Sequence, residues 1–350
     1  MNIQHLEEVK SLLSTPKDIV ITSHRNPDGD AMGSSLGLQL YLDQLGHSTK
    51  VAFPSEYPDF VGWMKGSDRI LIHDTDTEEV NAALEKADII FILDYNGLDR
   101  VDKMGEVIGA QKNTTKVMID HHLYPDNCAD FMFSDPSASS TCEMIYEFIV
   151  GLGDMKMISI ALGECLYAGI LTDTGSFKYS TSSKLFRVVA GLKDLGVDDV
   201  KLQNLLFNSL PEKNLRLLGH CLNNRMEILD EYNTGMIVLT KQDYEDFDIQ
   251  RGDTEGIVNY LLMMKKVKLA AFITEQPTIV KISLRSKGDF SVQEIAQKHF
   301  RGGGHKNASG GASFRGLKAT LKKFREILPE YKEQLTGIKA EVISEENITE

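Results

Sequence analysis

The chain of 350 residues is long enough for two domains, and 42% hydrophobic with 25% charged residues is the composition of an ordinary globular protein. A formal net charge of −13 argues against long nucleic acid as a partner, because an acidic surface repels its phosphates. The polar N-terminus lacks a secretory-signal pattern, and no apolar stretch predicts a membrane span. The four scattered cysteines indicate reduced thiols. We therefore expect a cytoplasmic protein with no membrane partner.

The first half of the sequence alternates short apolar runs with segments of helical periodicity. This pattern is typical of buried parallel strands in an α/β sheet. The predicted strands are 18–22, 49–53, 69–72, 89–93 and 117–119, and the predicted helices are 31–45, 139–152, 157–171 and 184–195. We therefore expect an N-terminal domain with a parallel sheet over residues 1–196.

Strand signals stop after this region. Residues 197–224 are amphipathic and predict a connector between domains. Alternating segments then predict further strands at 234–239, 269–274 and 278–284. They indicate a smaller, mixed α/β domain over residues 225–340, followed by an acidic tail at 341–350 that is expected to fray.

Side chains suited to metal binding gather where the predicted strands of the first domain end. They come from four segments: His24, Asp28 and Asp30; Asp94; Asp120, His121 and His122; and Asp173. Ligands of open α/β sheets bind at the carboxyl ends of the strands. Each residue alone has a structural explanation, such as a helix N-cap or a turn, but coincidence explains the joint placement poorly.

Mixed carboxylate and imidazole ligands predict two divalent cations. Mn²⁺ is favoured over Mg²⁺, because imidazole is a poor partner for Mg²⁺. Two such ions about 3.5–4 Å apart can activate a water and clamp a phosphoryl group during in-line attack. The residues therefore predict hydrolysis of a phosphate ester.

A second candidate site lies in the glycine-rich segment 301–311. It sits in a basic stretch, since residues 281–325 hold 11 Lys/Arg and 2 Asp/Glu, a balance of 11 − 2 = +9. Consecutive glycines let the backbone approach an oxyanion, and a nearby arginine can hold a phosphate through two hydrogen bonds. A flexible hairpin tip is the alternative interpretation. The predicted substrate-binding residues are Arg285, Gly302, Gly303, Gly304, His305 and Lys306.

These motifs resemble those of the DHH phosphoesterase family with its DHH-associated C-terminal domain. The matching stretches are S-H-R-N-P-D-G-D-A-M-G-S, the lone Asp94, the D-H-H triplet, Y-A-G-I-L-T-D-T-G-S-F and G-G-G-H-K-N-A-S-G-G. The resemblance spans nearly the whole chain. It implies a metal site in the cleft between the two domains.

The resemblance also implies a role for each residue. One metal ion would be held by His24, Asp28 and Asp94, and the other by Asp30, Asp94, His121 and Asp173, with Asp94 bridging the two. His122 would stabilise charge on the phosphoryl group, and Asp120 would orient a neighbouring histidine. Arg285 and the loop 302–306 would bind the nucleotide across the cleft.

Within the family, the sequence is similar to the compact members that degrade very short oligoribonucleotides and dephosphorylate 3′-phosphoadenosine 5′-phosphate (pAp). It is too short for a RecJ-type exonuclease and lacks the transmembrane pattern of membrane-anchored cyclic dinucleotide phosphodiesterases. Two rivals stay open: a stand-alone phosphodiesterase for cyclic di-AMP or linear pApA, and a nucleotide-binding regulator without turnover. The regulator is disfavoured because no ligand is missing. The resemblance is compatible with a homodimer.

Overall fold

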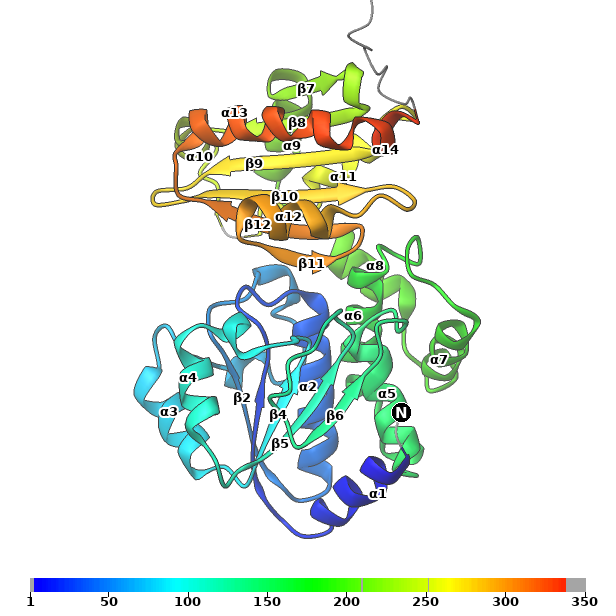
Figure 1. The fold of residues 1–350 in the computed structure, drawn as a ribbon. Coiled ribbons are helices and arrows are strands. Elements are labelled where there is room, and N and C mark those ends of the chain that lie inside the picture. The colour runs from blue at the N-terminus through cyan, green and yellow to red at the C-terminus, as the bar shows by residue number, and fades with distance from the viewer. Residues whose placement is uncertain (1–2, 209, 251, 338–350) are drawn as a thin grey trace, which may run out of the picture. The chain divides into compact units, whose positions relative to one another are not determined.

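A computed structural model describes residues 3–208, 210–250 and 252–337 of the chain (Figure 1). The chain divides into two compact units, Met1–Ser209 and Leu210–Glu350. Each unit contains a six-stranded sheet. In the described part of the chain, no helix is long and apolar enough to span a membrane.

The sheet of the first unit has the strand order β3-β2-β1-β4-β5-β6, and all neighbouring strands are parallel. Its strands are β1 (Asp18–Thr22), β2 (Ser48–Phe53), β3 (Leu71–Ile72), β4 (Ile89–Leu93), β5 (Thr115–Asp120) and β6 (Phe131–Ser134). The chain order reverses between β1 and β4. That switch point is where open α/β sheets bind ligands.

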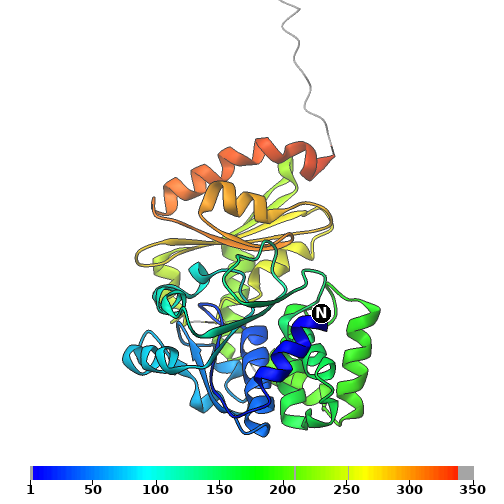
Figure 2. The same ribbon diagram turned by 60° about the horizontal axis from the view of Figure 1, so that its bottom comes forward.

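Helices cover both faces of this sheet, because its side chains alternate between two apolar cores. Ile19 and Ile21 of β1 face the larger core, whereas Val20 faces the smaller one. The larger core is formed with α1 (Ile3–Leu12), α2 (Gly29–Gln44), α5 (Thr141–Gly151), α6 (Ile160–Asp173), α7 (Ser183–Asp194) and α8 (Asp199–Phe207), and the smaller one with α3 (Thr77–Lys86) and α4 (Lys103–Ala110). Figure 2 shows α1, in dark blue, beside the green helices of this layer. The 3₁₀ helices of the unit are η1 (Asp59–Val61), η2 (Ser67–Arg69), η3 (Leu98–Val101) and η4 (Met155–Met157).

Close packing of α2 against α6 brings two parts of the predicted site together. A Cβ on Gly29 would overlap the Thr172 side chain, and one on Gly33 would overlap the Cys165 carbonyl. Only glycine at these positions lets the helices approach so closely. As a result, the first turn of α2 lies against the last turn of α6, and these turns carry Asp30 and Asp173.

The second unit has a mixed sheet with the strand order β11-β12-β10-β9-β8-β7, in which only β8 and β9 are parallel. Its strands are β7 (Met226–Leu229), β8 (Thr234–Leu239), β9 (Leu269–Glu275), β10 (Val280–Ser286), β11 (Gly303–His305) and β12 (Ala308–Ser313). Helices α12 (Val292–Phe300) and α13 (Leu317–Ile327) cover one face, and α9 (Glu212–Asn224) and α11 (Ile257–Leu262) the other. Its shorter helices are α10 (Lys241–Asp246), α14 (Lys332–Thr336), η5 (Asp230–Tyr232) and η6 (Leu328–Tyr331).

The predicted fold class is confirmed: a parallel sheet in the first unit and a mixed sheet in the second. Some elements differ from their predicted bounds. The strand expected over 69–72 is limited to β3, because residues just before it form η2. Residues 197–224, expected as a connector, contain α8 in the first unit and α9 in the second. The tail 341–350 lies outside the described residues.

Candidate metal centre

The predicted ligands of the first unit lie where neighbouring parallel strands end. Asp94 directly follows β4, Asp120 is the last residue of β5, and His24 comes two residues after β1. The first turn of α2 and the last residue of α6 add Asp30 and Asp173. Because carboxyl ends of parallel strands share one edge of the sheet, these side chains converge.

The first group of ligands surrounds the Nε2 atom of His24. This atom lies 3.4 Å from Asp94 Oδ2 and 4.0 Å from Asp28 Oδ2. The Nδ1 atom of the same ring lies 2.9 Å from the Arg25 carbonyl oxygen, which can only accept a hydrogen bond, so Nδ1 carries a proton. Nε2 is therefore the nitrogen that would bind a cation. Asp28 is also the N-cap of α2, through its other carboxylate oxygen.

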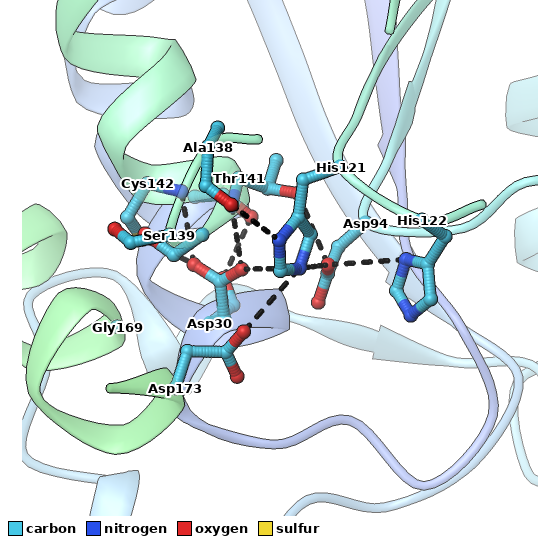
Figure 3. Close-up of polar contacts among 12 residues, drawn as sticks. Asp30, Asp94, His121, His122, Ala138, Ser139, Thr141, Cys142, Gly169 and Asp173 are labelled. Atoms are coloured by element: carbon cyan, nitrogen blue, oxygen red, sulfur yellow. Dashed lines mark hydrogen bonds and ion pairs between the residues drawn. The ribbon is translucent and has the colours of Figure 1, made fainter. Parts of the chain in front are cut away.

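The second group surrounds His121, as Figure 3 shows. Its Nε2 atom lies 3.3 Å from Asp173 Oδ2, 3.5 Å from Asp94 Oδ1 and 3.7 Å from Asp30 Oδ2. Its Nδ1 atom donates to the Ala138 carbonyl oxygen at 3.3 Å. The backbone thus orients both histidines in the same way, with Nε2 turned toward carboxylates.

The geometry and chemistry of these residues fit a pair of divalent cations. Ligand atoms of His24, Asp28 and Asp94 lie within 4.8 Å of one another, as do those of Asp30, Asp94 and His121. Asp94 belongs to both groups, and each of its oxygens faces a different histidine. Oxygen and imidazole ligands in two adjacent groups suit first-row divalent metals such as Mn²⁺.

The electrostatics of the cluster also favour bound cations. Burial and the neighbouring Asp94 raise the pKa of Asp30 to about 8. Burial and Asp30 likewise raise the pKa of Asp173 well above its usual value. Burial opposes the charge of His24, but the hydrogen bond with Asp94 and the negative charges of Asp28 and Asp94 together outweigh it and raise the pKa of His24 to about 9. Several buried carboxylates therefore compete for positive charge, which cations would supply.

The third residue of the D-H-H triplet is fixed by the first. His122 Nδ1 donates to Asp120 Oδ1 at 2.7 Å, and the His122 amide donates to Asp120 Oδ2 at 3.1 Å. Asp120 is fully buried. The carboxylate therefore holds the ring in one orientation, with Nε2 on the opposite side.

The glycine-rich segment of the second unit is a β-hairpin. Strands β11 and β12 pair from Gly303↔Gly310 to His305↔Ala308, and Lys306 and Asn307 form the turn. A Cβ on Gly302 would overlap the Gly310 carbonyl, and Gly304 has a φ of 136°. The glycines Gly303 and Gly304 therefore lie on a paired strand rather than at the tip of the hairpin. A role in substrate binding stays a prediction.

The second unit brings Arg285 beside this hairpin. On β12, Ala308 pairs with Arg285 of β10 on one side and with His305 of β11 on the other. Residues directly opposite in antiparallel strands point to the same face, so Arg285 and His305 share a face of the sheet. Lys306 instead forms an exposed ion pair with Asp289, with 3.0 Å between Nζ and Oδ1.

Two residues near the metal centre were missed in the sequence. Thr141, at the start of α5, is fully buried and donates its hydroxyl to Asp94. Arg25, next to His24, forms ion pairs with Asp74 and Asp102. No spacing in the sequence links these two residues to the ligands, although Arg25 lies inside the motif that contains His24.

Comparison with known proteins gives the family. A model described as "DHH family, N-terminal domain" matches residues 18–170, and one described as "DHHA1 domain" matches residues 233–336. The bifunctional oligoribonuclease and PAP phosphatase NrnA of Thermus thermophilus is 31% identical, over 91% of this chain and 90% of its own length. The chain belongs to the DHH family. The family predicted from the motifs is therefore confirmed.

Two further proteins are similar to this chain over most of its length. A solved structure of an exopolyphosphatase-related protein from Bacteroides fragilis is 39% identical, with a TM-score of 0.90 and coverage of 95% of this chain and 97% of that one. The cyclic-di-AMP phosphodiesterase PdeA of Listeria monocytogenes is 27% identical over 85% of this chain, but over only 45% of its own length. The DHH fold therefore extends over both units of this chain.

Proposed function

We propose that this protein is a two-metal phosphoesterase that hydrolyses very short oligoribonucleotides to mononucleotides and pAp to AMP. Membership of the DHH family makes it a hydrolase of the phosphoesterase type. One observation carries the proposal: a single buried carboxylate, Asp94, is shared by two adjacent groups of metal ligands. The resemblance to NrnA over nine-tenths of both chains supports the substrate class.

The two ligand groups would hold one cation each. His24, Asp28 and Asp94 form one set, and Asp30, Asp94, His121 and Asp173 form the other. When bound, a pair of divalent cations lowers the pKa of water and neutralises phosphoryl oxygens. Of Mn²⁺ and Mg²⁺, Mn²⁺ is better matched to a set of carboxylates that also contains imidazole.

The remaining polar residues would act on the substrate. Asp120 orients the His122 ring through Nδ1. In its imidazolium form, the ring would donate from Nε2 to the phosphoryl group and stabilise its developing charge. In the second unit, Arg285 and His305 share a face and would bind a phosphate that does not react. Lys306 would add positive charge at the hairpin turn.

Overall charge supports a short substrate. The protein carries a net charge of −13, so favourable phosphate contacts are confined to a small basic surface. A mononucleotide or very short oligonucleotide needs few such contacts, whereas a long strand would meet repulsion along its length. Cyclic di-AMP is the second candidate, because the chain is similar to part of PdeA.

A substrate panel tests the proposal. Full-length protein is stripped with EDTA and assayed with Mn²⁺ or Mg²⁺ on di- to pentaribonucleotides, pAp, pApA, cyclic di-AMP and inorganic polyphosphate. We expect no turnover after stripping, recovery with Mn²⁺, and the highest kcat/KM on the short RNAs or pAp. Highest activity on cyclic di-AMP would favour the second candidate, and no metal-dependent turnover of any substrate would refute the phosphoesterase assignment. Light scattering on the same sample tests the predicted homodimer.

A further inference from the structure

A single short segment, Ala138–Cys142, holds three of the proposed metal ligands in place. The Ala138 carbonyl accepts from His121 Nδ1 at 3.3 Å. The backbone amides of Thr141 and Cys142 donate to the two oxygens of Asp30, at 2.7 and 2.9 Å. Figure 3 shows these contacts converging on the cluster. None of these backbone contacts depends on which side chains the segment carries.

Local helix chemistry explains the two backbone amides. Ser140 is the N-cap of α5, and its hydroxyl accepts from the Glu143 amide. Thr141 and Cys142 are the first two residues of the helix, so their amides have no partner within it. Asp30 supplies the acceptors, and its negative charge also suits the helix N-terminus.

Thr141 makes a different contact through its side chain. Its hydroxyl donates to Asp94 Oδ1 at 3.0 Å, and both residues are buried. The same oxygen is 3.5 Å from His121 Nε2, while Asp94 Oδ2 is 3.4 Å from His24 Nε2. The rotation of this carboxylate about its Cβ–Cγ bond decides which oxygen faces which ligand group. A fixed hydroxyl on one oxygen limits that rotation.

The backbone of Asp94 gives a further reason why such a constraint is needed. Its φ is 62°, in the left-handed region that residues with a Cβ rarely adopt. This conformation turns the side chain at the end of β4, and the Asp94 amide is held by the Ile119 carbonyl at 3.2 Å. The main chain is thereby positioned, but the carboxylate rotation is not. The Thr141 hydroxyl adds a restraint on this rotation to the contacts with His24 and His121.

We propose that Thr141 is a positioning residue for the shared carboxylate. Its hydroxyl fixes Asp94 so that one oxygen serves the His24 group and the other the His121 group. The inference rests on the proposed function, because it takes both groups to be metal sites. Hydrogen-bonded partners of metal ligands typically contribute 10- to 100-fold to metal affinity or activity.

Matched substitutions separate this role from general stability. Thr141→Val keeps the shape but removes the donor, and Thr141→Ser keeps the donor but removes the methyl group. Thr114→Val is the control. Thr114 is also buried, and its hydroxyl donates to the Ala87 carbonyl. Thr114 directly precedes β5, at the opposite end of that strand from Asp120. Both valine variants lose one buried hydrogen bond, but only one of those bonds involves a ligand.

The measurement is Mn²⁺ binding to the EDTA-stripped full chain by calorimetry, followed by steady-state kinetics at saturating Mn²⁺. We expect Thr141→Val to weaken Mn²⁺ binding at least about tenfold and to lower kcat with KM unchanged. Thr141→Ser and Thr114→Val should bind Mn²⁺ like the wild type. If Thr141→Val does not fold, Thr141→Ala, which also lacks the hydroxyl but cannot clash, replaces it.

The outcomes distinguish this inference from the proposed function. If the wild type binds Mn²⁺ and turns over substrate while the variants without the hydroxyl behave identically, the positioning role is refuted and the function stands. Equal loss in Thr114→Val would also refute it, because the effect would then be one of stability. If the wild type itself neither binds a divalent metal nor hydrolyses any substrate, the proposed function fails.

Discussion

The two units of this protein present polar residues in opposite ways. In the first unit, Asp30, Asp94 and His121 are almost completely buried. Asp30 and Asp94 accept hydrogen bonds from the first turn of α5, and His121 donates one to the Ala138 carbonyl just before it. In the second, Arg285 and His305 are partly exposed and lie on β10 and β11, the two strands that flank β12. Burial strengthens electrostatic interactions, whereas exposure to water weakens them.

This difference indicates a division of labour. Buried, mutually fixed ligands create a rigid centre in which removing one group disrupts the others. Partly exposed residues on a sheet contribute separately and in smaller amounts. Substitutions in the first unit should therefore act on catalysis or folding with large effects, and substitutions in the second should act on substrate affinity or local stability with moderate ones.

The largest effect is expected for Asp94→Asn. The amide keeps the shape but removes the charge shared by both ligand groups, so bound cations lose a common ligand. We expect kcat to fall by at least about 10³, or about 4 kcal/mol of transition-state stabilisation. The control is Asp68→Asn, which removes an exposed carboxylate in η2. Retention of more than a tenth of the wild-type kcat by Asp94→Asn would contradict the bridging role.

Gly169→Ala should give the largest effect on folding. A Cβ at this position on α6 would lie 2.9 Å from Asp30 Oδ1 and would overlap Cys142 Sγ. We expect a loss of about 1–3 kcal/mol in the free energy of unfolding, the usual range for overpacked cores. Urea unfolding measures it.

Two further variants sharpen the test of close packing. Adding Cys142→Ala to Gly169→Ala removes the sulfur contact and should restore part of the stability. Gly219→Ala, in α9 of the second unit, places a Cβ where no heavy atom lies within 4 Å. There the gain in helix propensity should stabilise the protein by up to about 1 kcal/mol. Equal effects of the two glycine substitutions would contradict the steric argument.

Arg285→Ala tests the second unit directly. A charge-assisted hydrogen bond to phosphate contributes about 1.5–3 kcal/mol, so KM should rise about 10- to 150-fold. Because Arg285 belongs to the second unit and to neither group of proposed ligands, Mn²⁺ affinity should not change. Lys306→Ala should raise KM less, since Lys306 is exposed and already pairs with Asp289. A fall in Mn²⁺ affinity for Arg285→Ala would contradict the division between the units.

Much of the metal centre was accessible from sequence, for a physical reason. Parallel strands align their carboxyl ends, so residues such as Asp94 and His121 can be grouped without knowing how helices pack. Both residues lie within the range 18–170 that the DHH model matches. Thr141 could not be found in this way, because its contact with Asp94 depends on the packing of α5 against the sheet edge.

The second unit was harder to predict, because its informative residues are glycines. Glycine allows both an open anion-binding loop and a tightly paired strand. In this segment Gly303 pairs with Gly310 in a strand, and this pairing across the hairpin leaves no periodic signal in the sequence. Two short strands, β7 in the second unit and β6 in the first, were not predicted, because four residues carry little periodicity.

The last expected effect concerns the stability of the second unit and its dependence on pH. Asp243 of α10 is buried, which would raise its pKa, but hydrogen bonds from Arg225 and Thr240 outweigh burial and lower the pKa of Asp243 to about 2. A carboxyl group with a lowered pKa in the folded state contributes stability above its unfolded pKa of about 4, and this contribution is lost as the pH falls toward about 2. Asp243→Asn removes the charge at every pH.

We therefore expect Asp243→Asn to lower the free energy of unfolding by about 2 kcal/mol at pH 7, with the difference from the wild type shrinking between about pH 4 and pH 2. Urea unfolding at pH 7 and at pH 3 measures it. Asp246→Asn, in the same helix but exposed, is the control and should change stability little. Since Asp243 lies in the second unit, Mn²⁺ binding by the first should be unaffected at pH 7. A stability difference that stays constant from pH 7 to pH 2 would show that shape, rather than charge, is what Asp243 contributes.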